Sequence, residues 1–449
     1  LMALGNQQIV ELGSEHGVDA PEELLEQIHA RNAHDFGRWP QGLIELCDDW
    51  RRHGEIRPHV KQVESHVLAR LKARPERKER ADLSPERALK GAQRLALAVM
   101  LCRRWTFRYG AGADLPGSGE LPLDPTVLLE DWSAQEVRAL LERPLFGDGG
   151  YGRARFRHRS VLEYLAACQL HDQIESGTIS LSATMRILFG RTDLNEKVAK
   201  PSLRPVAAWL ALLRKDVFEV ILKIDPATLL IFGDPESLQQ IQCQRALGAF
   251  VDLHGQGQRR GLEIPSLQVS RLARQPLGSV TLSLWTAGIE NPEVRTLLLK
   301  LVSEGRYVEC ADLASGVAAD PAVNSYERFE ALLALASLSD GRLSGYIESA
   351  MSVARGWPQA IGRWLGTSLY PERVTDAQLL RLLGKVTRES RHELDFAGSI
   401  ARVVKNAELG VARLQALLPG LTALTRKLVA LQDDEVAERP GQLEGSLVL

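Results

Sequence analysis

Apolar side chains recur at helical spacing along most of the chain. Residues 39–52 place Leu43, Leu46 and Trp50 on one helix face, because positions three, four and seven apart coincide at 3.6 residues per turn. Similar spacing predicts helices over 21–31 and 59–71, and a charged stretch follows at 72–80. We therefore expect residues 1–80 to form a helical domain.

The next segment carries strand signals between helix signals. Ser84 and Pro85 predict a helix start, with a side-chain cap and a first residue of fixed φ, and Ser133 with Glu136 forms a capping box. Residues 144–146 and 153–156 are strand candidates, with a glycine-rich turn at 147–150 and a closing helix at 160–174. This order predicts a winged-helix-like domain over residues 81–178.

From residue 179 onward one amphipathic helix follows another. Several starts are predicted where Asp or Asn precedes Pro, namely at Asp225-Pro226, Asp234-Pro235, Asn291-Pro292 and Asp320-Pro321. Residues 179–432 are therefore expected to form an α-helical repeat array of HEAT-like or TPR-like type, and 433–449 a flexible tail. The fold class is mostly α, with strand confined largely to 144–158 and the turn at 106–109, and we expect no continuous sheet beyond residue 180.

Composition limits the classes of function. Among 449 residues, 45% are hydrophobic and the formal net charge is −2, so the chain can bury large cores and shows no general excess of basic residues. No run of 18 apolar residues exists, which predicts no membrane span and a cytoplasmic protein. The five cysteines are far apart and are expected to be small buried side chains in a reducing compartment, with no disulfide or metal site: Cys47, Cys102, Cys168, Cys243 and Cys310.

Enzyme signatures are missing from the sequence. It contains no G-x-x-x-x-G-K-[ST] phosphate loop, no G-x-S-x-G and no H-E-x-x-H. The ten histidines are scattered, and most are expected on the solvated surface. We expect no catalytic residue, no cofactor bound by this chain alone, and no ATP hydrolysis by it.

One segment carries a family resemblance. Residues 156–167, FRHRSVLEYLAA, resemble the F-x-H-x-S-[FV]-x-E-[FY]-L-A-A signature of NACHT-type STAND ATPases, where a winged-helix domain passes from its wing strand into a helix. Residues 37–46 and 50–56 resemble the helical lid of the same family, in the same order along the chain. The rest of the chain is similar to this family only in general architecture, because bacterial members, including antiviral STAND (Avs) proteins, end in long helical arrays.

The resemblance implies the switch and sensor portion of a signalling ATPase in bacterial defence. The phosphate loop, the core strands and an N-terminal effector would precede Leu1, and ATP or ADP with Mg would bind in the full-length protein. A protein trigger would bind the array, and activation would produce a homo-oligomer.

Two residues inherit nucleotide contacts from this resemblance. His158 would reach the ADP β-phosphate, or else only tie the wing to the next helix, whose cap Ser160 could supply. Pro40 would pack on the adenine, or else only open a helix as its first residue.

A second function belongs to a different class. The chain could be a non-enzymatic helical-repeat scaffold whose winged helix binds nucleic acid. Arg153, Arg155, Arg157 and Arg159 alternate, which predicts one basic strand face that could meet phosphates. Arg157 and Arg159 could equally face the phosphates of ADP or an acidic surface of the core.

Overall fold

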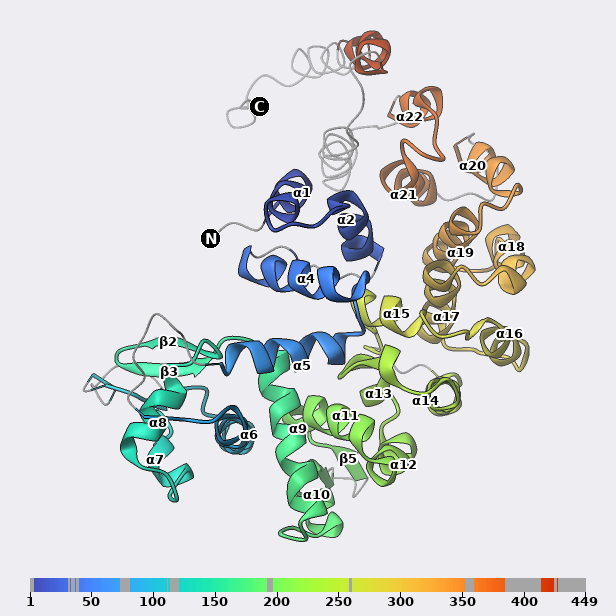
Figure 1. Cartoon of the computed structure of the whole chain (residues 1–449). Coiled ribbons are helices and arrows are strands. Elements are labelled where there is room, and N and C mark those ends of the chain that lie inside the picture. Colours follow the sequence, from blue (N-terminus) through green and yellow to red (C-terminus); the bar gives the residue numbers. More distant parts are fainter. Residues whose placement is uncertain are drawn as a thin grey trace, which may run out of the picture. The chain divides into compact units, whose positions relative to one another are not determined.

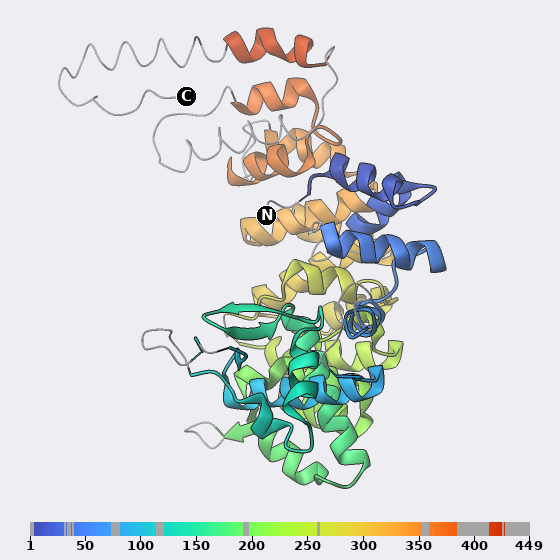
Figure 2. The same ribbon diagram turned by 60° about the vertical axis from the view of Figure 1, so that its left-hand side comes forward.

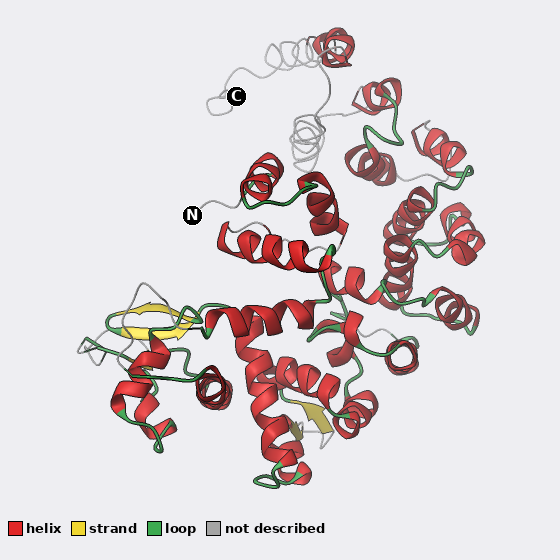
Figure 3. Ribbon diagram, viewed as in Figure 1, coloured by secondary structure: helices red, strands yellow, loops and turns green. Residues whose placement is uncertain are grey.

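The computed structural model describes residues 4–30, 33, 37, 40–72, 81–110, 112–113, 121–191, 197–257, 261–351, 359–383, 413–423 and 426. Most described elements are helices, and the strands form two small antiparallel sheets (Figure 3). The chain forms two compact units, Leu1–Leu297 and Leu298–Leu449, with the boundary inside one helix. Among the described residues, no helix combines the length and apolar character needed to cross a membrane.

The first helices share one core. Helices α1 (Asn6–Glu15), α2 (Pro21–Ala30) and α4 (Pro40–His53) bury Ile9, Leu24, Ile28, Leu43 and Cys47 between them, and α5 (His59–Arg70) follows. The three predicted helices are thus confirmed within a residue or two. Arg57 links α4 to α5, because its guanidinium donates to Asp49 (Nε to Oδ2, 2.9 Å) and to Ser65 Oγ (2.6 Å).

The next segment combines helices with a three-stranded sheet. Its elements are α6 (Pro85–Cys102), β1 (Phe107–Arg108), α7 (Pro125–Leu128), α8 (Ala134–Leu141), β2 (Phe146–Gly150), β3 (Arg153–Phe156) and α9 (Arg159–Glu175). Both predicted caps are present: Ser84 Oγ accepts from the amide of Arg87, and Ser133 forms a capping box with Glu136. The antiparallel sheet has the order β1-β3-β2, and helix α6, seen end-on in Figure 1, packs against α9.

The hairpin turn lies later than predicted. We expected residues 147–150 to form the turn, but β2 runs through Gly150, and the chain reverses at Tyr151 (φ 51°) and Gly152 (φ 70°). The register pairs Phe146 with Phe156, whose rings lie 4.6 Å apart between centroids. That buried aromatic pair fixes the strand alignment, so residues 147–149 extend the strand, and Gly150 (φ 77°) is the first of three consecutive residues in the left-handed region.

The remaining helices of the first unit follow from residue 181. They include α10 (Leu181–Leu188), α11 (Arg204–Leu213), α12 (Lys215–Ile224), α13 (Ala227–Ile231), α14 (Gln240–His254), α15 (Ser266–Leu272), α16 (Gly278–Thr286) and α17 (Pro292–Gly305), with short 3₁₀ turns η1 (Pro201–Leu203) and η2 (Pro235–Ser237). Beyond residue 180, where we expected no continuous sheet, the described residues include one pair of short strands. Strands β4 (Phe189–Arg191) and β5 (Lys197–Ala199) pair antiparallel and bury Phe189 against Ala199, and three residues are too few to give a readable period.

The predicted Asp-Pro and Asn-Pro starts had mixed outcomes. Asn291-Pro292 opens α17, with Asn291 Oδ1 accepting from the amide of Glu293 at 3.0 Å, and Asp225-Pro226 directly precedes α13. However, Asp234-Pro235 opens only the 3₁₀ turn η2, and Asp320-Pro321 lies in a turn. The next helix, α19 (Ser325–Ser337), takes its cap from Asn324 instead. A cap and a proline fix one turn of backbone, and packing decides whether the helix continues.

The second unit consists of consecutive helices. After the end of α17 come η3 (Val308–Cys310), α18 (Ala311–Ala319), α19, α20 (Leu343–Met351), α21 (Gln359–Leu369) and α22 (Asp376–Leu383). Helix α19 packs on α18 and α21, and the orange helices of this unit lie side by side in Figure 2. Ion pairs join neighbours, such as Arg342–Asp312 (2.8 Å) and Arg381–Glu348 (2.8 Å). The predicted tail, 433–449, lies outside the described residues.

The cysteine prediction holds for three of the five side chains. Cys47, Cys243 and Cys310 are buried, and Cys168 is half-buried, but Cys102 is exposed. Cys102 is the last residue of α6, next to exposed Leu101. The last two residues of α6 therefore lie beyond its buried part, which ends at Met100.

Candidate functional site around His158

His158 lies at the junction between β3 and α9. Its backbone is extended (φ −122°, ψ 130°), and it is the N-cap residue of a 17-residue helix. Ser160 lies inside the first turn of α9, so the expectation that its hydroxyl caps this helix was wrong. Within the described part of the chain, the His158 side chain makes no capping hydrogen bond to α9. The helix therefore presents its positive end at this junction.

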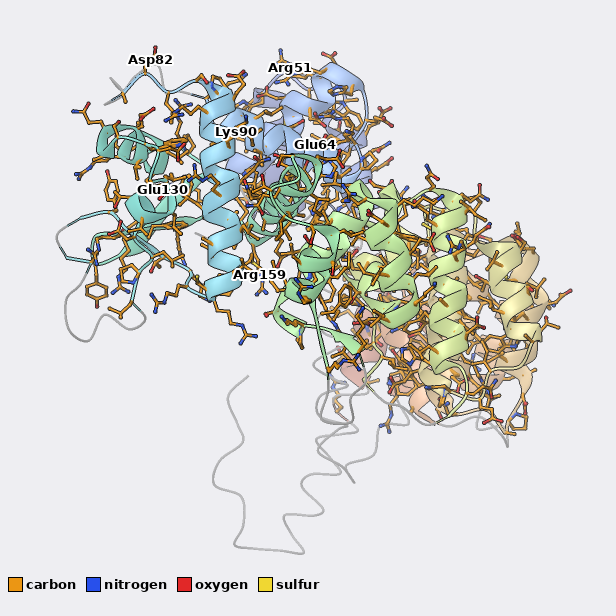
Figure 4. The ribbon with its side chains drawn as sticks, turned by 90° about the horizontal axis from the view of Figure 1, so that it is seen from below. Arg51, Glu64, Asp82, Lys90, Glu130 and Arg159 are labelled. Carbon is orange, nitrogen blue, oxygen red and sulfur yellow. The ribbon has the colours of Figure 1, made fainter. Side chains whose placement is uncertain are left out.

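A second histidine meets the first. The ring of His66, which is buried on α5, lies edge-on to the ring of His158, with 4.8 Å between centroids and 88° between planes. The hydroxyl of Tyr164 on α9 also donates to Glu64 Oε1 on α5 at 3.2 Å. Figure 1 shows α9 beginning beside α5, and Glu64 and Arg159 are labelled in Figure 4. Two side-chain contacts thus fix α9 on α5.

A cavity of about 360 Å³ adjoins this junction. It is bounded by the start of α5, the start of α9, helix α11, the end of α13 with the residues after it, and helix α15. Its lining combines polar and apolar side chains: His59, His158, Arg159, Ser160, Glu163, Trp209, Ile231, Phe232, Gly233, Leu267, Gln268 and Arg271.

Burial sets the charge state of the cavity walls. Burial lowers the pKa of His59 well below its usual range, and the nearby positive charge of Arg271 lowers it further, so this imidazole is neutral at pH 7. Its ring lies 5.7 Å from that of Trp209, between centroids. Burial also raises the pKa of Glu163, and Arg159 partly offsets the shift through a 2.8 Å ion pair (Nε to Oε1).

These side chains suit a ligand with an acidic group. Arg159 is exposed whereas Arg271 is buried, so the cavity has one cationic group at solvent and one inside the protein. An uncapped helix start and guanidinium groups are donors that phosphate and carboxylate groups accept from.

Pro40 lies elsewhere in the first unit. It is the first residue of α4 and is half-buried, as a proline that opens a helix should be. It is not among the described residues that line the cavity beside His158. The structure therefore shows the helix-opening role directly, and the adenine contact stays a prediction.

The predicted basic strand face is not formed. Arg153 is buried, and its guanidinium donates to the carbonyl of Ala113 (Nη2 to O, 2.7 Å). Strand β3 ends at Phe156, so Arg157 and Arg159 are not on the strand. Arg155 and Arg157 are exposed. The Nε of Arg157 donates to the Phe146 carbonyl at 2.9 Å. Arg153 is therefore buried, with the Ala113 carbonyl as its partner, at a strand position that alternation alone would expose.

Sequence reasoning missed most of this site. Most of the histidines were expected on the solvated surface, but His59 and His66 are buried. The one available signal was their spacing of seven residues, two helical turns, which places both on one side of α5. Trp209 and Arg271 had no local signal, because they reach the cavity from helices distant in sequence.

Comparisons with protein-family models, with curated proteins and with solved structures gave no match to the chain. The resemblance of residues 156–167 therefore rests on those residues and on their structural setting.

Proposed function

We propose that this chain is the switch and sensor portion of a STAND-type signalling ATPase. The observation that carries the proposal is the position of His158. The motif's histidine is the N-cap residue of α9, where strand β3 passes into a 17-residue helix. A helix start of this kind favours a phosphate, since its first backbone amides and its dipole both attract negative charge.

In this proposal each segment has a separate role. Helices α1 to α5 act as the lid that follows the ATPase core, and α6 to α9 with their sheet act as the winged-helix domain. The helices from α10 onward form the repeat array that recognises a protein trigger. The full-length protein supplies the phosphate loop and the Mg ion, works in the cytoplasm, and assembles into a homo-oligomer when activated.

The switch depends on a contact that domain rotation can break. An imidazole donates a hydrogen bond to the ADP β-phosphate, and a charge-assisted bond of this kind contributes about 1.5–3 kcal/mol. The closed and open forms of a switch differ by only a few kcal/mol, so losing this bond changes their ratio about ten-fold or more. This chain alone should neither retain ADP nor hydrolyse ATP, because one hydrogen bond falls short of the cost of association.

The test compares two histidine variants in the protein that carries its ATPase core. His158→Ala should reduce the ADP that co-purifies, or cause signalling without a trigger, while the protein stays folded. His254→Ala is the control, because His254 also lies in the first unit but is buried against Phe250 and is not among the described residues that line this cavity. ADP content and melting temperature are measured together. A folded His158→Ala protein with normal ADP content and normal trigger dependence would refute the sensing role.

The nucleic-acid alternative receives little support from the arginines. Arg153 is buried and Arg157 is partly engaged by a backbone carbonyl, so few guanidinium groups remain to neutralise phosphates. An electrophoretic shift assay with duplex DNA decides between the two functions. We expect no salt-sensitive micromolar binding, and such binding would favour the scaffold that reads nucleic acid.

A further inference from the structure

The start of α5 has an unusual cap. Within the described residues, its N-cap residue, Pro58, supplies no side-chain hydrogen bond. The carboxylate of Asp234 takes that place, with Oδ2 accepting from the amide of Val60 at 2.9 Å across 174 positions of sequence. A residue before η2 therefore stabilises the first turn of a helix that belongs to a different segment.

Contacts outside α5 also hold Asp234 and its neighbours in position. Ser237 donates its hydroxyl to the same oxygen, Oδ2, at 2.6 Å. Gly233, at φ 69°, lies so close to the backbone of Ala208 that a Cβ would be 3.3 Å from its carbonyl carbon. Gln275 donates to the carbonyl of Glu236 at 2.8 Å. Contacts from α11 and from the segment after α15 thus set the position of this carboxylate.

Only one of the two carboxylate oxygens of Asp234, Oδ2, accepts hydrogen bonds among the described residues. Asp234 is 1% exposed, and its Oδ1 has no hydrogen-bond partner among the described residues. A buried carboxylate oxygen without a partner carries a desolvation cost. The bond to Val60, together with the positive end of α5, offsets that cost only while α5 is in place.

Helix α5 also contacts both segments on which the switch depends. Arg57 joins it to α4, and the His66 and Glu64 side chains join it to α9. A displacement of α5 therefore changes the position of the ring that lies against His158. The cap from Asp234 is a hydrogen bond that the following helices make to this connecting helix.

We propose that Asp234 is a latch: its carboxylate holds α5 in the resting position, and a partner that displaces residues 233–238 releases α5 and the His66–His158 contact. The hydrogen bond itself does not depend on the proposed function. Its consequence for signalling does, so the two are tested by separate measurements.

Hydrogen–deuterium exchange of the chain tests the latch directly. Asp234→Ala should speed exchange in the first turn of α5 roughly five- to thirty-fold, the range for a lost cap. Asp234→Asn keeps an acceptor and should have a smaller effect. Asp124→Ala is the matched control, because Asp124 caps α7 by accepting from the amide of Thr126 at 3.0 Å, and it should leave α5 unchanged.

Each outcome decides one question. Exchange in α5 within two-fold of wild type in a folded Asp234→Ala protein would overturn the latch, and so would an equal acceleration throughout the first unit. In the protein with its ATPase core, the latch predicts that Asp234→Ala also lowers ADP retention. Faster exchange of α5 with unchanged ADP retention would support the latch and overturn its link to the switch.

Discussion

Two glycines in helices predict opposite effects of the same substitution. Gly91 lies in α6, where an added Cβ would be 2.5 Å from Cη2 of Trp132 and 2.9 Å from Cδ2 of Leu140. Gly248 lies in α14, where no described heavy atom is within 4 Å of such a Cβ. Both glycines belong to the first unit. Alanine at Gly248 changes helix propensity only, whereas alanine at Gly91 changes helix propensity and packing together, so the difference between the two variants measures the packing effect.

The magnitudes follow from these distances. At Gly248, alanine should raise the free energy of unfolding by about 0.5–1 kcal/mol, the helix-propensity difference between the two residues. At Gly91 the same gain is opposed by an overlap of roughly 1 Å with a large ring. Arg87 stacks on that ring at 4.6 Å, and Leu140 is fully buried, so neither neighbour moves freely. Overpacking of this kind costs about 1–3 kcal/mol, and Gly91→Ala should be destabilising.

Thermal melting of the two variants, followed by circular dichroism, measures the difference. We expect Gly248→Ala to raise the midpoint by a few degrees and Gly91→Ala to lower it, at roughly 2–4 °C per kcal/mol for a unit of this size. A double variant should lie between them. A shift of both single variants in the same direction would refute the close packing of Trp132 on α6.

Three further predictions concern buried groups. Arg143→Met should destabilise the first unit by about 2–5 kcal/mol in urea denaturation, because this buried guanidinium donates to the carbonyls of two residues that flank the segment between α5 and α6. Arg138→Met, at an exposed position of α8, should cost under about 1 kcal/mol in the same assay, and equal losses for the two variants would contradict this. Cys102 should react with a maleimide in the folded protein, whereas Cys243, whose thiol pKa burial raises to about 12, should react only after unfolding; mass spectrometry that finds both labelled equally would contradict this. Glu163→Gln should stabilise the protein at pH 7, because a raised carboxyl pKa favours the folded state only below the unfolded value. The gain in melting temperature should shrink toward pH 4 and below, and a gain that grows as the pH falls would refute it.

Local interactions made the helices readable from the sequence. Ser84, Ser133 and Asn291 cap helices where the sequence predicts them, because a cap depends on residues within one turn. The periodic apolar positions of α4 and α5 gave their extents for a similar reason. The mostly helical fold and the strand on either side of the hairpin turn therefore follow from the sequence.

The candidate site was predictable only at its centre. The motif around His158 identified the junction between β3 and α9 from twelve consecutive residues. The residues that surround it come from α5, α11 and α15, and no periodicity relates positions in different helices. Only the packing of those helices decides which side chains meet.

Tertiary structure also changed what individual residues do. Asp234 begins as a predicted helix cap for its own segment, yet its carboxylate caps α5 instead. Arg153 was predicted to be a solvent-facing cation, yet it is buried and donates to the carbonyl of Ala113. In both cases the sequence correctly predicted the chemical role of the side chain, as an acceptor or as a cation, but not the group with which it interacts. A polar group needs a hydrogen-bond partner when it is buried, and only the folded chain determines which partner is within reach.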